Sequence, residues 1–81
     1  MTAEELRSHI LRGLPCDHAQ VLSDDGQHFE AVIVSPQFTG ISRVQQHQRV
    51  YQSLGDRMRS EVHALSLRTF TPEAWAQSNH P

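Results

Sequence analysis

Apolar residues recur along the first part of the chain at the spacing of a helix. The recurring positions, four residues apart, are Leu6, Ile10 and Leu14. This spacing places them in one stripe along a helix. Thr2 and Glu5 have the spacing of a capping box, so the helix is expected to begin there. Gly13 and Pro15 disfavour its continuation, and the pattern therefore predicts a helix that ends near residue 13.

The next segment, residues 18–35, reads as two strands joined by a turn. Two runs rich in β-forming residues flank SDDG, whose Asp25–Gly26 step favours a tight turn with a positive φ. In the second run one face carries Phe29, Ala31 and Ile33, and the other carries Val32 and Val34. Apolar residues on both faces indicate an interior strand rather than an edge strand.

The following stretch contains a loop and a second, interrupted helix. Residues 36–40, PQFTG, hold a proline and a glycine and predict the loop. Ser42 is placed to cap the helix, and Gly55 interrupts it before a further helical turn over residues 56–61. Its expected apolar side consists of Val44, His47, Tyr51 and Leu54, with Val50 adjoining.

The last part predicts a third strand and a short helix. Residues 62–70, VHALSLRTF, form the strand, and Thr71 with Pro72 has the cap-then-proline order of a helix start. The polar tail, residues 77–81, is expected to fray. Roughly 26 residues separate the second strand from the third, which is long enough for a helical crossover and hence a parallel pair. The predicted fold is α+β, a two-layer sandwich with a three-stranded mixed sheet, in one domain over residues 1–81.

Size and composition limit the possible functions. The chain has 81 residues and a formal charge of −2, and its seven cations are all arginines, which disfavours nucleic acid as the main ligand. The single cysteine, Cys16, excludes an internal disulfide and a zinc site built of cysteines. No signal peptide and no apolar stretch of the roughly 18 residues that cross a membrane is found, so a cytoplasmic protein is expected. No catalytic triad or phosphate-binding loop has supporting spacing, and Asp24 with Asp25 belongs to a turn, so no enzyme is expected.

Several motifs occur together in a familiar order. They are HF at residues 28–29, F-x-G at 38–40, RV…VY…L at 43–54, VHALSL at 62–67 and T-P-x-x-W at 71–75. In this order they resemble the BolA family, and its IbaG-like branch in particular. The resemblance implies a fold similar to class II KH domains. It also implies a monothiol glutaredoxin as partner, often around a [2Fe–2S] cluster shared with that partner and glutathione, in iron–sulfur trafficking or in iron and stress regulation.

The resemblance also changes how the histidines are interpreted. His63 taken alone is best explained as a structural histidine at a strand start, whereas the family's cluster ligand falls on this position. The family's second ligand is a cysteine or histidine in the loop between the first two strands, but SDDGQ contains neither. His28 is the nearest candidate, with the alternative that it only pins the turn, and His18 is a weaker one. Cys16 is expected to pack beneath the first helix, and His47 to be a core or interface residue.

A different function remains open beside this one. BolA relatives have been linked to DNA, and Arg57 and Arg59 lie in a helix-turn-helix-like segment, residues 42–60. Neighbouring acidic residues dilute their charge, and the GxxG clamp of RNA-binding KH domains is absent. A weak homodimer is also left open. Trp75 is expected to pack the last helix onto the sheet.

Overall fold

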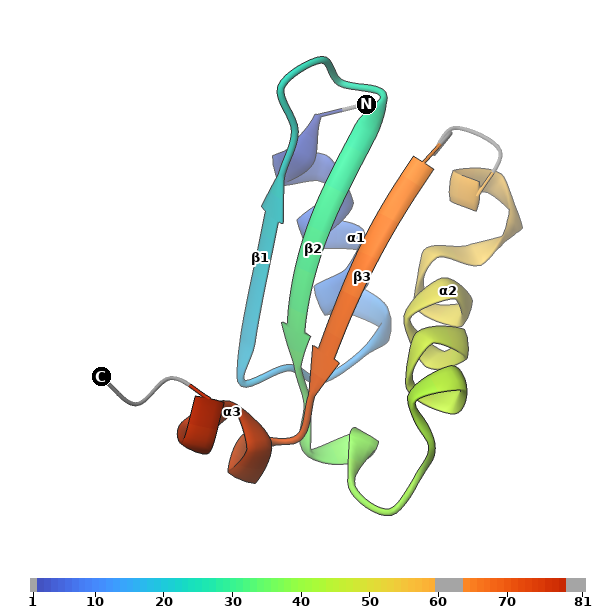
Figure 1. Ribbon diagram of the computed structural model, residues 1–81. Coiled ribbons are helices and arrows are strands. Elements are labelled where there is room, and N and C mark those ends of the chain that lie inside the picture. Colours follow the sequence, from blue (N-terminus) through green and yellow to red (C-terminus); the bar gives the residue numbers. More distant parts are fainter. Residues whose placement is uncertain (1, 60–63, 79–81) are drawn as a thin grey trace.

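The computed structural model describes residues 2–59 and 64–78, and the side chains at positions 57–59 and 64 are outside this description. The elements follow the expected order (Figure 1). They are α1 (Ala3–Gly13), β1 (His18–Leu22), β2 (His28–Val34), a 3-10 helix η1 (Pro36–Phe38), α2 (Arg43–Arg59), β3 (Ala64–Phe70) and α3 (Pro72–Ser78). No helix among the described residues is both long and apolar enough to cross a membrane.

The sheet confirms the predicted pairing. Its order is β1-β2-β3, with β1 antiparallel to β2 and β3 parallel to β2. β2 is the interior strand that its apolar residues on both faces predict, since both of its edges are hydrogen-bonded and the face away from the helices still carries the fully buried Val34. In the register, His28 lies beside Ala64 at one end of the parallel pair and Val34 beside Phe70 at the other.

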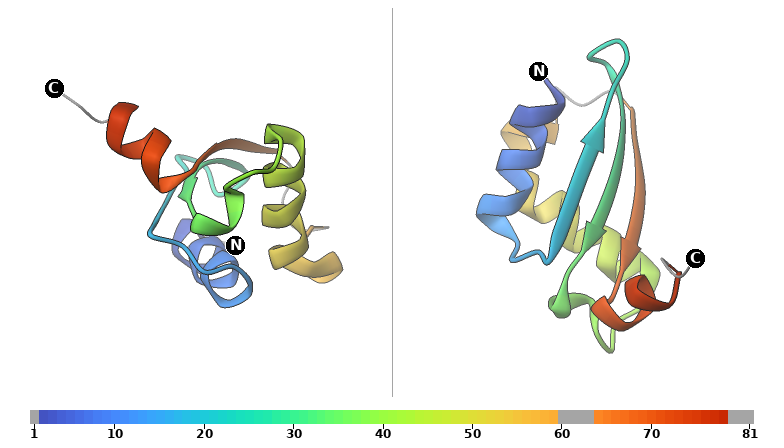
Figure 2. Two further views of the ribbon diagram at one scale, coloured as in Figure 1. Left: turned by 90° about the horizontal axis from the view of Figure 1, so that it is seen from below. Right: turned by 90° about the vertical axis from the view of Figure 1, so that its left-hand side faces the viewer.

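Helices α1 and α2 cover the same face of the sheet, as Figure 2 shows. The core between these layers consists of buried residues from both helices, β1, β2 and η1: Leu6, Ile10, Leu14, Ala19, Phe29, Ala31, Ile33, Phe38, Val50 and Leu54. The two-layer prediction is therefore confirmed. Two residues depart from expectation. Phe38 is fully buried although it lies in the predicted loop, and Val44, assigned to the apolar side of the helix, is 67% exposed.

Local chemistry fixes both ends of the helical layer. Thr2 and Glu5 form the predicted capping box at the start of α1, with reciprocal hydrogen bonds of 3.1 Å. Gly13 at the other end lies against Ser53 of α2, so closely that a Cβ there would be 2.9 Å from Ser53 backbone atoms. Gly55 has φ 72°, and at this residue α2 is interrupted as predicted.

Helix α3 takes a position that the two-layer prediction did not include. It begins after Thr71, whose Oγ1 accepts a hydrogen bond from the Ala74 N–H, and it runs through Ser78, two residues into the segment expected to fray. Figure 2 shows α3 away from α1 and α2, at the far end of the sheet. The Trp75 ring stacks on His18, with 5.1 Å between ring centroids, and lies 5.3 Å from Phe70. Trp75 thus packs as predicted, and it spans both edge strands.

Candidate functional site

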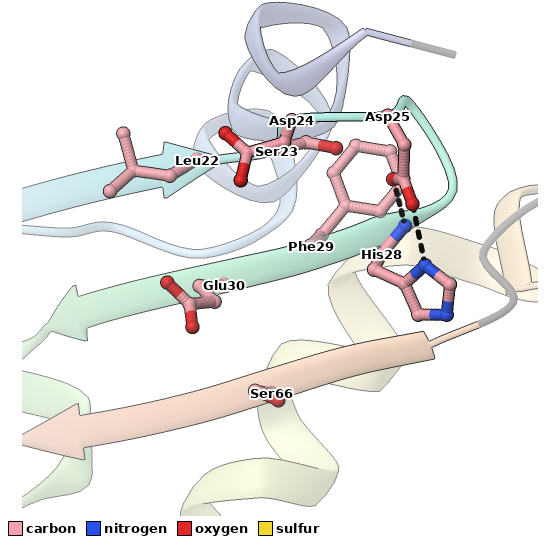
Figure 3. Close-up of a pocket in the computed structure, with 8 residues that line it drawn as sticks. All are labelled: Leu22, Ser23, Asp24, Asp25, His28, Phe29, Glu30 and Ser66. Carbon is pink, nitrogen blue, oxygen red and sulfur yellow. Dashed lines mark hydrogen bonds and ion pairs between the residues drawn. The ribbon is translucent and has the colours of Figure 1, made fainter.

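The candidate site lies where β2 begins, beside the start of β3 (Figure 3). A hollow of about 470 Å3 opens there. Its lining residues come from the end of β1, the turn, β2 and β3: Leu22, Ser23, Asp24, Asp25, His28, Phe29, Glu30 and Ser66. Three of these are acidic and one is a histidine, so the hollow has the character of a site for a cation rather than for an anion.

The carboxylate of Asp25 organises the turn before β2. Its Oδ1 accepts hydrogen bonds from the backbone N–H groups of Gln27 and His28, both at 2.9 Å. Gly26 supplies the positive φ of 73°, and its N–H donates to Ser23 Oγ at 2.9 Å. The short turn is therefore held by side chains of its own residues.

The same carboxylate also holds the ring of His28. Asp25 Oδ2 lies 2.8 Å from His28 Nδ1 (Figure 3). The backbone N–H groups of His28 and then Gln27, followed by the His28 ring, lower the pKa of the Asp25 carboxyl well below its ordinary value. Asp25 is thus a carboxylate at neutral pH and can only accept, so the neutral His28 ring carries its proton on Nδ1.

This arrangement leaves Nε2 of His28 as the free lone pair of the ring. The side chain is 70% exposed, and Nε2 accepts no hydrogen bond from the described residues. Metal-binding histidines commonly have this form, with one nitrogen oriented by a carboxylate and the other left for the metal. His28 therefore has the features of a single ligand prepared for a metal brought from outside the chain.

The sheet register places His28 beside the residue that follows the other predicted ligand, His63, in the sequence. His28 is the register partner of Ala64, the residue that directly follows His63. His63 itself lies outside the described residues, so its ligand role stays a prediction. Within residues 2–59 and 64–78, no group of three or more potential metal ligands is found.

The remaining candidates lie elsewhere. His18 pairs with Val34 at the opposite end of β2 from His28, and its ring is stacked on Trp75. Cys16 is half-buried, its Sγ donates to the Leu14 carbonyl at 3.1 Å, and burial, with the Asp17 charge, raises the pKa of its thiol. Both observations support a packing role for these residues.

The other three candidates lie on α2. His47 lies on α2, and its Nε2 is buried without a hydrogen-bond partner among the described residues. Arg57 and Arg59 fall in the last turn of α2, but their side chains lie outside the described part of the chain. Their predicted DNA contacts are therefore untested.

Asp25 is the site residue that sequence reasoning missed. It was interpreted only as part of a turn, because Asp-Gly is a common turn dipeptide. The signal available in the sequence was the spacing D-x-x-H, in which an aspartate at the start of a tight turn can reach both the backbone and the side chain three residues later.

Comparison with known proteins gives one consistent family. A sequence model described as "BolA-like protein" matches residues 12–74. The acid stress protein IbaG of Escherichia coli K12 is 35% identical over 78 residues, which are 95% of this chain and 92% of that protein. A BolA protein homologue from Coxiella burnetii is 40% identical in a solved structure, with a TM-score of 0.76, 94% of this chain covered and 97% of that one.

A further relative carries a functional name. The DNA-binding transcriptional regulator BolA of Haemophilus influenzae is 50% identical over 52 residues. The match covers 64% of this chain, and only 50% of the relative's own length. The similarity to that protein is therefore strong but confined to half of it.

Proposed function

The chain belongs to the BolA-like family, and we propose that within this family it acts as a non-catalytic adaptor that docks a monothiol glutaredoxin and shares a [2Fe–2S] cluster with it. Membership supports the adaptor class, because the family resemblance implies this partner and this cargo. The 35% identity to the acid stress protein IbaG, over 95% of this chain, supports a role in stress regulation, and the family resemblance extends the proposal to iron–sulfur trafficking or iron regulation.

The oriented imidazole of His28 is the observation that carries the proposal. Neutral imidazoles can replace two thiolates on one iron of a [2Fe–2S] cluster, as in Rieske centres. We assign His63 and His28 to this iron, and the glutaredoxin cysteine with a glutathione thiol to the other. The register of His28 with Ala64 supports a joint role, since the two strand starts lie side by side.

Asp25 would act in this proposal as a positioning residue. By accepting a hydrogen bond from the Nδ1–H group it keeps the lone pair on Nε2 and fixes the plane of the ring. Its low pKa means that the Asp25 carboxylate stays ionised at neutral and mildly acidic pH and remains able to accept this hydrogen bond. The loop therefore needs no residue of its own as a ligand, although the family usually places one there.

The proposal is tested by mixing the protein with cluster-loaded glutaredoxin and recording visible absorption and circular dichroism. We expect a heterodimer spectrum distinct from that of the glutaredoxin homodimer. His63→Ala and His28→Ala should each return the spectrum toward the homodimer, because the mixed nitrogen and sulfur ligand set is lost. His9→Ala removes an imidazole of α1 that does not line the hollow, and should leave the spectrum unchanged.

The outcomes separate the parts of the proposal. An unchanged heterodimer spectrum with His63→Ala would show that the imidazole at this position is not a ligand. If His28→Ala leaves the heterodimer spectrum unchanged while His63→Ala alters it, the adaptor function stands and the second ligand is another group. Docking without any cluster-dependent spectrum would reduce the protein to an interaction module.

DNA binding is the second candidate function, favoured by the name of the Haemophilus influenzae relative. In this case residues 42–60, with Arg57 and Arg59, would contact the phosphate backbone. Affinity for a short duplex should then fall steeply between about 50 and 200 mM salt, and each arginine replaced by alanine should reduce the salt slope by about 1. Fluorescence anisotropy at several salt concentrations measures this affinity. Weak binding that changes neither with salt nor with the substitutions would exclude DNA binding through these arginines.

A further inference from the structure

A second hollow, of about 220 Å3, lies between the first half of α2 and the later part of β3. We call it the arginine hollow. Its lining consists of Arg43 and His47 from α2, and Leu67, Arg68, Thr69 and Phe70 from β3. Because β2 and β3 are parallel, the β3 lining lies toward the other end of the sheet from His28. The arginine hollow is thus separate from the candidate metal site.

The charge of the arginine hollow is opposite in sign to that of the hollow beside His28. None of its lining residues is acidic. Arg43 and Arg68 are both exposed, and neither forms a salt bridge with any residue in the described ranges. Glu30 shares a third hollow with Arg68, yet no contact within 4.0 Å joins their charged atoms. Two arginines without a salt bridge to the described residues therefore line one small concavity, in a chain whose net charge is −2.

The groups around the arginine hollow are held in place before any ligand arrives. The Arg68 guanidinium lies over the Phe70 ring, 5.9 Å from its centroid. Thr69 Oγ1 donates to Gln46 Oε1 at 2.7 Å, which ties β3 to α2 where the hollow opens. Gln46 in turn donates to the Phe38 and Ile41 carbonyls at 3.3 Å. The distance between the two arginine-bearing elements is therefore fixed by hydrogen bonds.

The histidine of this hollow is also unusual. His47 Nε2 is buried and has no hydrogen-bond partner within residues 2–59 and 64–78. Proteins leave few buried polar groups unsatisfied, and those that remain call for an explanation such as a ligand or an ordered water. His47 lines the hollow together with the two arginines, so its imidazole adjoins them there.

We propose that the arginine hollow binds the phosphate group of a small phosphorylated molecule. The guanidinium forks of Arg43 and Arg68 match the geometry of phosphate oxygens and remain charged at every physiological pH. The volume falls short of the roughly 300–1,000 Å3 of pockets that enclose drug-sized ligands, so it suits one phosphate group with the rest of the molecule outside. This inference goes beyond the adaptor function and does not depend on it.

The test uses the full chain without glutaredoxin or cluster. Pyrophosphate is titrated into 15N-labelled protein at low salt, and two-dimensional NMR follows the backbone amides. We expect saturable shifts at Arg43, His47 and residues 67–70, with a Kd on the order of 1 mM. Arg43→Gln and Arg68→Gln should each weaken binding by about tenfold, since each removes one charged hydrogen-bonding fork.

Arg49→Gln is the matched control. It is also an exposed arginine of α2, but it lines another hollow with Gly13 and Ser53, on a different side of the helix. It should bind pyrophosphate as the unchanged protein does. Equal weakening by Arg49→Gln, or shifts spread evenly over all arginines, would show non-specific ion attraction and overturn the proposal.

A second arm separates the possible sources of the phosphate. A nucleoside diphosphate and a short single-stranded oligonucleotide are titrated in the same way. Saturable shifts with pyrophosphate and the diphosphate support the proposal. Binding of the oligonucleotide alone, with pyrophosphate silent, overturns it and assigns the surface to nucleic acid. Circular dichroism confirms that the exposed substitutions leave the fold intact.

Discussion

At the scale of the residue, a single carboxylate links the turn to the candidate ligand. Asp25 accepts two backbone N–H groups and the His28 ring within one turn, so the conformation of the loop and the orientation of the imidazole depend on the same side chain. The sequence alone identifies the turn and selects His28 as a candidate. It does not reveal the role of Asp25, because the direction of a short side chain is decided by the local backbone and not by spacing.

Asp25→Asn tests this link through the pH dependence of stability. The lowered pKa of Asp25 means that its contribution is complete above the ordinary aspartate pKa of about 3.9 and is lost as pH falls through the lower folded value. We expect the urea midpoint of Asp25→Asn to lie below that of the unchanged protein at pH 6. The difference should narrow steadily on acidification below about pH 4, because the unfolded form of the unchanged protein then takes up a proton at Asp25 while the folded form does not.

The neighbouring substitution Asp24→Asn is the control for this measurement. Asp24 lines the same hollow but accepts no hydrogen bond from the described residues. Its urea midpoint should follow that of the unchanged protein at each pH. A gap for Asp25→Asn that stays constant from pH 6 to pH 2.5 would contradict the assigned role of the carboxylate.

At the scale of the element, the close approach of α1 and α2 determines how the helical layer fits the sheet. Gly13 permits this approach because it has no side chain where it meets Ser53. The sequence predicts both helices from their apolar spacing and the caps at their ends. It misassigns Val44 and overlooks Phe38, since a periodic pattern cannot show where a helix leaves the core or that a proline-containing loop folds back into it.

Gly13→Ala is expected to destabilise the protein. The added methyl group would lie 2.9 Å from Cα, Cβ and the carbonyl oxygen of Ser53, and backbone atoms cannot move aside without shifting α2. Such overpacking costs about 1–3 kcal/mol of the free energy of unfolding. This cost exceeds the stabilisation of up to about 1 kcal/mol that alanine gives over glycine inside a helix. That stabilisation is smaller at a helix end, where Gly13 lies.

Urea denaturation measures this effect. Arg12→Ala, one residue earlier on the exposed side of α1, should change the free energy of unfolding by no more than about 0.5 kcal/mol. If Gly13→Ala proves as stable as the unchanged protein or more so, the helices are not held at the distance that the structure shows.

At the scale of the whole molecule, the sheet has one face covered by helices and, among the described residues, one face that is largely open. Helices α1 and α2 cover the first, and α3 with Trp75 reaches only the end of the second. Element order and the parallel pairing could be predicted, because the crossover length leaves few alternatives. The position of α3 could not, since a seven-residue helix has no periodic signal to indicate which face it packs against. In the candidate site, the contact with Asp25 supports the choice of His28, whereas the role of His63 rests on the family resemblance and stays a prediction.

The parallel pairing of β2 with β3 has a consequence for how the protein is made. Helix α1 and the hairpin of β1 and β2 contain only neighbouring segments, and they can form while the chain is still emerging from the ribosome. Strand β3 lies 29 residues after β2, so its pairing closes a long loop and belongs among the slow, late steps. We therefore expect a nascent chain to bring position 28 beside position 64 only after β3 has left the ribosome, so products truncated before Ala64 would lack the strand edge that we propose as the cluster site.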